Sequence, residues 1–524
     1  MRTVRIRIIA TLMVLVAAGV GGWQLLPQKD DPGRTVTVGT TDVITSLDPA
    51  GAYDAGSWAL YSNVFQSLLT FEPGSTTPVP DAARGCRFLD AGLRTYRCEV
   101  RAGIRFPSGR AMTAQDVKYS FDRVREIHAR VGPSSLFDTL RTVEARGRTV
   151  TFHLSSPDAT FPFKVATGAG SIVDRNVYPA DTLRAGGSAS AGDSGVDGTG
   201  PYTLKVYKPG SQAALVPNSR YKGAAKVPDH PTTLRYYKDS AALETAWKRH
   251  AVDVAARQLP PSLLATLSTS DPDQRLTEVD GAETRNLVLN VRDGKPLHDR
   301  RVRQALASLI DRDELVESAY RGTVDSLFSL VPRGITGHTT AFFDAYPKPD
   351  PARARELLRG AGVKVPVRFE FAYSRGAASK AEAAEIERQL ERSKLFEVTT
   401  KYYDWEEFQE RYAAGKLDAY AVGWLPDFPD PDTFTAQLVR TGSGMHNGYS
   451  SKSVDQLIMA SQQYEDRSRT LKDFRRLQEL VARDVPIVPL WQRKEYVLGT
   501  EDITGGQYLS DGTGVFRLWE LDWI

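Results

Sequence analysis

The clearest pattern of apolar and polar positions lies in the second half of the chain. Two stretches have the 3.6-residue period of amphipathic helices: one starts at Ser379 with Glu382, and the other covers Trp405–Ala414 and ends at Gly415. Three short runs rich in β-branched and aromatic residues flank them and predict strands: Val367–Tyr373, Phe396–Tyr403 and Ala419–Trp424. This alternation of strands and helices predicts an α/β fold with a parallel sheet and right-handed crossovers.

The ends of these strands indicate where a ligand binds. In open parallel sheets, ligands lie beyond the carboxyl ends of the strands. Those ends are Tyr373-Ser374 and Gly423-Trp-Leu-Pro-Asp427. We therefore expect a cleft lined by these two segments.

The first half of the chain has a mixed pattern that is richer in strands. Thr35–Gly39 and Thr149–Leu154 read as strands. Thr113–Val124 reads as a helix, with Thr113 as its cap and Asp116 as the partner in a capping box. The stretch from Arg184 to Gly198 is rich in Gly, Ser and Ala, which is typical of an exposed flexible loop.

The two cysteines, Cys86 and Cys98, flank a hairpin pattern with Asp90-Ala-Gly92 at its tip. Folding the chain about Gly92 places Cys86 opposite Cys98, at a spacing that suits a disulfide. Two buried free thiols are the alternative. Two cysteines are too few for a disulfide scaffold, a four-cysteine zinc site or an iron–sulfur cluster.

The N-terminus carries a membrane signal. Arg2, Arg5 and Arg7 precede Ile8–Leu26, nineteen residues without a formal charge. At about 1.5 Å per residue this run spans roughly 28 Å, close to the thickness of a bilayer's apolar core. An uncleaved anchor uses the whole run, whereas a cleaved signal peptide uses its first half and the small residues from Val16 to Ala18. We favour the anchor, because apolar residues continue past that cleavage site, and expect the rest of the chain outside the cytoplasm.

Composition narrows the class of protein. The 524 residues are 41% apolar and 25% charged, which is ordinary globular usage. The net charge of +3 equals the contribution of the three N-terminal arginines, so the remaining chain is balanced. Nothing in this balance favours a nucleic acid as partner.

Signatures of catalysis and of metal binding are missing from the sequence. It contains no phosphate-loop, nucleophile-elbow or zinc-helix motif, and its seven histidines are scattered. Asp427, Asp430 and Asp432 crowd into a proline-rich loop, but their spacing does not match that of a calcium loop. We therefore predict no catalytic residues, no metal and no cofactor.

Several segments, in this order, resemble family 5 of the bacterial extracellular solute-binding proteins, the dipeptide-, oligopeptide- and nickel-binding components of ABC importers. The resemblance covers about residue 35 to the C-terminus. Its main strings are Val38-Gly-Thr-Thr41, Ser46-Leu-Asp-Pro49, Gly103-Ile-Arg-Phe106, Met112-Thr-Ala-Gln-Asp-Val-Lys-Tyr-Ser-Phe121, Gly198-Thr-Gly-Pro-Tyr202 and Gly423-Trp-Leu-Pro-Asp-Phe-Pro-Asp-Pro431.

The resemblance implies a two-lobed fold of the periplasmic-binding-protein kind (type II) that closes on its ligand by hinge bending. After the N-terminal segment 1–34, the first lobe would comprise 35–287 and 490–524, with an extra mixed α/β subdomain at about 65–185. The second lobe would comprise 288–489. The hinge would lie near Leu287–Asn290 and Pro489–Trp491.

The resemblance also implies a monomeric binding protein that delivers peptides to a membrane permease. Asp427 matches the position whose carboxylate receives a peptide's ammonium group, and Trp424 matches a pocket wall. Ser57, Trp58 and Tyr373 are further candidates for ligand contact.

Other ligands and roles remain open. Ala421 stands where some peptide-binding relatives have an arginine, and the sequence identifies no cation for a peptide's carboxylate. This leaves metal chelates and glycosides as alternative ligands. A membrane-tethered sensor or scaffold would have the same fold, whereas a secreted hydrolase would need a nucleophile and base that the sequence does not show.

Overall fold

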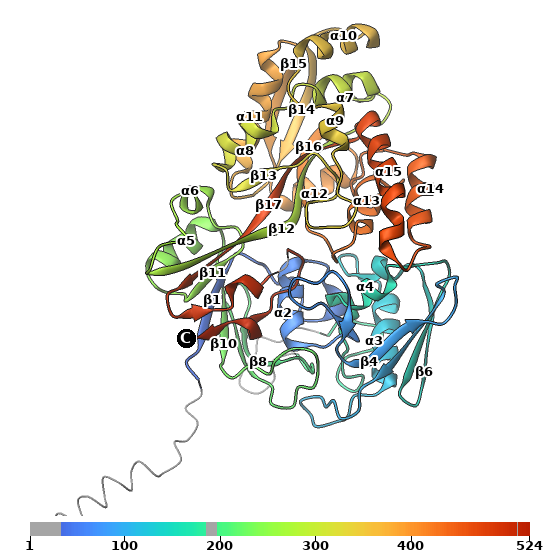
Figure 1. Cartoon of the computed structure of the whole chain (residues 1–524), viewed down its shortest axis with the longest axis vertical. Coiled ribbons are helices and arrows are strands. Elements are labelled where there is room, and N and C mark those ends of the chain that lie inside the picture. The colour runs from blue at the N-terminus through green and yellow to red at the C-terminus, as the bar shows by residue number, and fades with distance from the viewer. Residues whose placement is uncertain (1–32, 185–195, 511) are drawn as a thin grey trace, which may run out of the picture.

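The computed structural model describes residues 33–184, 196–510 and 512–524. It has two lobes, one above the other in Figure 1, joined by the long strands β12 and β17. The predicted membrane segment Ile8–Leu26 and most of the predicted flexible loop at 184–198 lie outside the described residues. Within the described residues, no helix has the length and apolar character needed to cross a membrane.

One eleven-stranded sheet runs through both lobes, in the order β15-β14-β16-β12-β17-β11-β1-β10-β9-β8, with β13 also paired to β17. Its strands are β1 (Val36–Thr40), β8 (Tyr202–Lys208), β9 (Gln212–Pro217), β10 (Thr232–Tyr236), β11 (Val254–Ala256), β12 (Gln274–Leu289), β13 (Val324–Ser326), β14 (Val367–Tyr373), β15 (Phe396–Tyr402), β16 (Ala419–Trp424) and β17 (Ile487–Thr500).

The antiparallel strands β12 and β17 connect the lobes. Their pairing runs from Gln274 opposite Thr500 to Val288 opposite Ile487, and its register breaks between Asp280 and Thr284. Before this break β17 also pairs with β11 of the first lobe, and after it β12 pairs with β16 of the second. Two extended strands with one irregularity are therefore the main covalent and hydrogen-bonded link between the lobes.

The second lobe confirms the predicted strand and helix order. β14 pairs in parallel with both β15 and β16, and α11 (Ser379–Arg392) and α12 (Trp405–Ala413) are the crossover helices. One detail differs from the sequence pattern. Glu382 does not cap α11; it is fully buried and accepts hydrogen bonds from Arg285, Tyr320 and Trp491. Three donors from other elements compensate for the burial of this carboxylate.

Further helices cover the second lobe: α7 (Arg300–Ala307), α8 (Arg312–Tyr320), α9 (Ala341–Ala345), α10 (Pro351–Ala361), α13 (Asp432–Val439), α14 (Lys452–Ser461) and α15 (Leu471–Asp484). In Figure 1, α8 and α11 flank the sheet on one side and α13, α14 and α15 lie on the other. The buried apolar side chains of this lobe form one cluster that extends from Leu287 to Trp491.

The first lobe contains α2 (Ala55–Val64), α4 (Phe161–Val165), α5 (Ser240–Lys248), α6 (Pro261–Leu264) and two short strand pairs: β2 (Leu69–Thr70) with β3 (Val79–Pro80), and β18 (Ile503–Thr504) with β19 (Asp522–Trp523). Its main cluster draws on residues from Val36 to Ala256 and on the C-terminal segment from Val497. Single turns of 3₁₀ helix lie at Pro49–Gly51, Ser134–Phe137, Gly168–Gly170 and Leu518–Glu520 in this lobe and its C-terminal part, at Arg467–Thr470 in the second lobe, and at Gly506–Tyr508.

A four-stranded antiparallel sheet, in the order β4-β5-β7-β6, forms with α3 (Ala114–Ile127) the subdomain at the lower right of Figure 1. The strands are β4 (Ala83–Phe88), β5 (Thr95–Val100), β6 (Leu140–Arg146) and β7 (Thr149–Leu154). The predicted capping box of α3 is confirmed.

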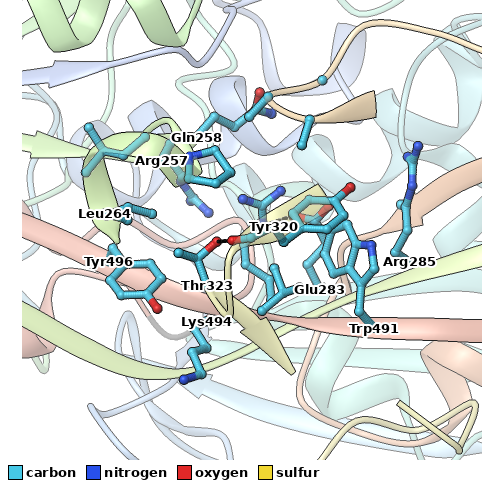
Figure 2. Close-up of a pocket in the computed structure, with 18 of the residues that line it drawn as sticks. Arg257, Gln258, Leu264, Glu283, Arg285, Tyr320, Thr323, Trp491, Lys494 and Tyr496 are labelled. Atoms are coloured by element: carbon cyan, nitrogen blue, oxygen red, sulfur yellow. Dashed lines mark hydrogen bonds and ion pairs between the residues drawn. The ribbon is translucent and has the colours of Figure 1, made fainter. Parts of the chain in front are cut away.

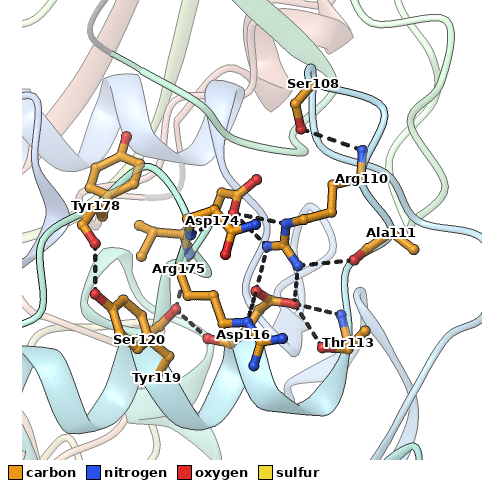
Figure 3. A network of polar contacts seen from close by, with 12 residues as sticks. Ser108, Arg110, Ala111, Thr113, Asp116, Tyr119, Ser120, Asp174, Arg175 and Tyr178 are labelled. Carbon is orange, nitrogen blue, oxygen red and sulfur yellow. Dashed lines mark hydrogen bonds and ion pairs between the residues drawn. The ribbon is translucent and has the colours of Figure 1, made fainter.

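A charged network secures the start of α3 (Figure 3). The guanidinium of Arg110 contacts both carboxylate oxygens of the buried Asp116 and reaches Asp174 at 2.9 Å. The same Asp116 accepts the backbone N–H of Thr113 at 2.9 Å. One arginine thus ties the helix start to the segment around Asp174.

The predicted disulfide is confirmed. Cys86 and Cys98 are directly opposed on β4 and β5, and their sulfur atoms are bonded. Replacing both with alanine should lower the free energy of unfolding by about 2–3 kcal/mol, because the unfolded chain loses a loop constraint. Chemical denaturation with and without reductant measures this. Reductant should destabilise the wild type and leave the double variant unchanged; equal stability of the two oxidised proteins would contradict the prediction.

Candidate functional site

A cavity of about 140 Å³ lies between the lobes, beside the crossing strands (Figure 2). Arg257, Gln258 and Leu264 line it from the first lobe. Tyr320 and the segment from Arg375 to Ser379 line it from the second. The floor belongs to the crossing strands, which contribute Glu283, Arg285, Trp491, Arg493 and Glu495. The cavity therefore lies at the carboxyl ends of β14 and β16, where the sequence predicts a cleft.

The floor of this cavity is a row of partly buried ion pairs. Arg493 pairs with Glu283, and Arg285 pairs with Glu382 at 2.7 Å. Burial alone would raise the pKa of Glu283, but the neighbouring guanidinium of Arg493 outweighs it and lowers the pKa. For Glu495 burial dominates and raises the pKa. Most of the floor charges are therefore compensated by protein partners.

Arg375 differs from these arginines. It follows β14 by two residues, its side chain is exposed, and within the described residues it makes no ion pair. A guanidinium at the rim of a cavity with no carboxylate partner is available to an anionic group of a ligand. The sequence shows only that Arg375 follows the end of a strand. It does not predict that the guanidinium lacks an ion-pair partner within the described residues.

Asp427 lies on the loop after β16 and is 9% exposed. Its Oδ2 accepts the phenol O–H of Tyr53 at 2.8 Å, across the lobes, and the hydroxyl of Thr433 at 3.3 Å. Burial raises the pKa of Asp427 to about 6, although the hydrogen bonds from Tyr53 and Thr433 and the charge of Lys164 act in the opposite direction. A carboxylate held in this way gains from a further cationic partner.

A smaller cavity of about 50 Å³ lies against Asp427. Trp58 lines it and is 5% exposed; its indole N–H donates to the carbonyl of Ala52 at 3.2 Å. The ring of Trp58 contacts that of Tyr53, with centroids 5.4 Å apart. Phe428, next to Asp427, contacts Phe163 of the first lobe, with ring centroids 5.8 Å apart. Aromatic side chains from both lobes thus enclose the aspartate.

The other predicted site residues have different surroundings. Ser57 is fully buried, and its hydroxyl donates to Asp54 and accepts the backbone N–H of Thr45. Trp424 is partly buried against the core of the second lobe, and its buried indole nitrogen has no hydrogen-bond partner among residues 33–184, 196–510 and 512–524. Tyr373 is half-buried and contacts Tyr402, with ring centroids 5.7 Å apart. Of the five candidates, Asp427 and Trp58 line the same cavity.

The three clustered aspartates have separate partners. Asp430 forms a two-pronged ion pair with Arg467 at 2.7 and 2.9 Å, and Asp432 accepts the side-chain amide of Gln462 at 3.2 Å. Elsewhere in the described residues, Asp229, His230 and Asp522 bring ligand atoms within 4.8 Å of one another. Those carboxylates already have His230 at 3.0 Å and Lys226 at 3.3 Å as partners. We assign no metal centre to either group.

Two lobes, two connecting strands and a cavity between them are the architecture of a solute-binding protein. The chain belongs to the bacterial extracellular solute-binding proteins, family 5, whose middle region it matches over residues 77–445. This confirms the resemblance predicted from the sequence.

Individual relatives extend the match to most of the chain. It is 26% identical over 467 residues to the dipeptide-binding protein of Escherichia coli strain K12, covering 83% of this chain and 84% of that one. It is 26% identical over 512 residues to di/tripeptide-binding protein 2 of Pseudomonas aeruginosa strain UCBPP-PA14, covering 92% of each. A periplasmic binding protein of Helicobacter pylori, solved with the peptide STSA, shares the fold at a TM-score of 0.80 and 20% identity, covering 94% of this chain and 98% of that one.

Proposed function

We propose that this protein captures short peptides between its lobes and delivers them to the permease of an ABC importer. The observation that carries the proposal is the placement of two opposite charges. Asp427, a buried carboxylate, and Arg375, a guanidinium without an ion-pair partner in the described residues, follow the parallel neighbours β16 and β14. A peptide with free termini carries an ammonium group at one end and a carboxylate at the other, and so complements both.

Lobe closure fits this role. The register break between Asp280 and Thr284 lies where the crossing strands leave the first lobe, and we propose it as a bending point. Leu287 and Leu289 already pair with β16, so they would move with the second lobe. A ligand that contacts both lobes would favour the closed state by its difference in affinity for the two states.

The names of the relatives also support peptide import: several are dipeptide- or di/tripeptide-binding proteins. A role in binding without catalysis agrees with the names of these relatives. The second candidate function is that of a membrane-tethered sensor with the same fold. We also propose that Ile8–Leu26 attaches the protein to the membrane, which its length and lack of charge support.

Replacing Arg375 tests the proposal. Arg375→Ala should weaken binding of a dipeptide with a free carboxylate about tenfold, because it removes a charge-assisted contact worth about 1.5–3 kcal/mol. Binding of the C-terminally amidated dipeptide should change little. Isothermal titration calorimetry measures both affinities.

Arg368→Ala is the matched control, because Arg368 lies on β14, the strand that precedes Arg375, is exposed and pairs with Glu397 at 2.9 Å. It should bind both peptides as the wild type does. Equal losses for the free and amidated peptides in Arg375→Ala, or a wild type that ignores amidation, would contradict the assignment of Arg375.

A further inference from the structure

Glu495 lies on the crossing strand β17, lines the cavity between the lobes and is only 4% exposed. Its Oε1 is buried without a hydrogen-bond partner, and its side chain makes no ion pair, across residues 33–184, 196–510 and 512–524. A buried carboxylate is costly unless it is paired and hydrogen-bonded. A cationic group that entered the cavity would supply the missing partner.

The stem of Glu495 is held against the backbone of the neighbouring strand β12. Gly281 lies there, within the register break of the two strands. A Cβ atom at Gly281 would lie 3.1 Å from Cγ of Glu495 and 2.8 Å from the carbonyl oxygen of Arg493. The glycine therefore leaves the space in which the stem packs, and the carboxylate stays at the floor of the cavity.

The two cations that act on Glu495 are engaged elsewhere. Arg257 lies 3.6 Å from Asp42, and Arg493 pairs with Glu283. Burial raises the pKa of Glu495 more than the charges of Arg257 and Arg493 lower it. These arginines therefore do not compensate the carboxylate.

The other cations that line the cavity show the opposite imbalance. Arg285 pairs with Glu382, and Lys494 pairs with Glu278 at 2.9 Å. Arg375 makes no ion pair within the part of the chain that the structure describes. The cavity thus offers one unpaired charge of each sign, a guanidinium at its rim and a carboxylate at its floor.

The size and the walls of this cavity suit a single long side chain. Its volume is about 140 Å³, and a protein cavity of about 150 Å³ accommodates a molecule the size of benzene. Leu264, Trp491 and Tyr496 are among the apolar and aromatic residues that line it (Figure 2). An aliphatic stem that carries a charged head can bury its methylene groups along such walls.

We infer that Glu495 receives a cationic side chain of the ligand, and that the preferred peptides end in lysine or arginine. A carboxyl-terminal basic residue carries both charges that the cavity lacks, a carboxylate for Arg375 and a cation for Glu495. This inference rests on the proposed function and adds the chemical class of the side chain to it. Glu495 is thus a residue that determines specificity.

The test compares alanyl-lysine with alanyl-norleucine by isothermal titration calorimetry. Norleucine has the aliphatic chain of lysine without its ammonium group. The wild type should bind alanyl-lysine about tenfold or more tightly than alanyl-norleucine, because charge-assisted hydrogen bonds are stronger than neutral ones. In Glu495→Gln the two affinities should agree within about twofold.

Glu278→Gln is the matched control, because Glu278 lies on the neighbouring strand β12, is exposed and does not line the cavity. It should keep the wild-type preference. Lysyl-alanine, with the same charge on the first residue, should show no such advantage over norleucyl-alanine in the wild type. An advantage there that Glu495→Gln removes would overturn the placement of the basic residue at the carboxyl end.

The same titrations separate the inference from the proposed function. A wild type that binds alanyl-lysine and alanyl-norleucine equally well would overturn the role of Glu495 and leave peptide binding in place. A preference for alanyl-lysine that persists in Glu495→Gln would do the same. A wild type that binds neither dipeptide would overturn the proposed function, and the inference with it.

The stability of Glu495→Gln provides a readout without any ligand. The folded-state pKa of Glu495 is raised, so its ionised form costs stability at neutral pH. Glu495→Gln should therefore fold and keep the melting temperature of the ligand-free wild type, or exceed it. A marked fall would mean that the carboxylate has a partner within the protein, and would overturn the inference.

Discussion

Asp427→Asn is expected to weaken binding of a free dipeptide by about tenfold to a hundredfold at pH 7.5. The substitution keeps the shape of the side chain and removes the charge that an ammonium group would meet. Charge-assisted hydrogen bonds contribute about 1.5–3 kcal/mol, which corresponds to this range of affinity. The N-acetylated dipeptide, which the wild type should bind poorly, should lose little further affinity. Equal losses for both would mean that Asp427 only shapes its loop.

The pH dependence gives the same prediction a second readout. Burial holds the pKa of Asp427 at about 6 in the free protein. The carboxylate therefore takes up a proton as the pH falls through about 6, and the affinity of the wild type for the free dipeptide should fall with it. Asp427→Asn should show no such step. Calorimetry between pH 5 and pH 8 measures both profiles.

Unfolding of the Asp427→Asn variant would not explain its weaker binding of the free dipeptide. A folded-state pKa above the unfolded value means that the ionised aspartate costs stability above about pH 6, and that this cost disappears as the carboxylate is protonated at lower pH. Removing the charge should therefore not lower the melting temperature of the ligand-free protein at pH 7.5. A marked drop in that temperature would contradict the sign of the shift.

Arg123→Ala is expected to have the largest effect on stability. The side chain is 3% exposed and donates two hydrogen bonds of 2.6 Å to Asp48, which is 1% exposed. Removing one partner of a buried ion pair leaves the other charge uncompensated and typically costs about 3–5 kcal/mol. Asp48 also caps the turn at Pro49–Gly51 through the backbone N–H of Ala50. The loop that carries Tyr53 follows this turn, so peptide binding should weaken too.

Denaturant unfolding of the variant measures the loss. Arg125→Ala is the control on the same helix: Arg125 is about one-third exposed and lies 4.0 Å from Asp122, so its loss should cost under about 1 kcal/mol. Replacing Asp48 by asparagine in the Arg123→Ala background should recover part of the stability, because the buried charge is gone. A loss below about 1 kcal/mol in Arg123→Ala would contradict the prediction.

Short-range patterns in the sequence predicted much of the second lobe and the subdomain of the first. The strands Val367–Tyr373 and Ala419–Trp424 have the predicted bounds, and the cysteines are paired as the hairpin pattern indicates. These features depend on periodicity and on turn residues within about ten positions of one another, which a single sequence displays directly. The place of Asp427 beyond a parallel strand follows from the same information.

The sequence by itself thus determined the α/β class, the alternation of parallel strands and helices in the second lobe, the disulfide and the family. The tertiary structure alone decided which charged side chains are paired within the protein and which are available to a ligand. Glu382 has the spacing of a helix cap but is buried with three donors from distant elements. Arg375 has the same side chain as the paired Arg285 and Arg493, and Tyr53 and Asp427 are 374 positions apart. Whether a charged group is compensated or free depends on neighbours brought together by folding, and the local pattern of a sequence does not contain them.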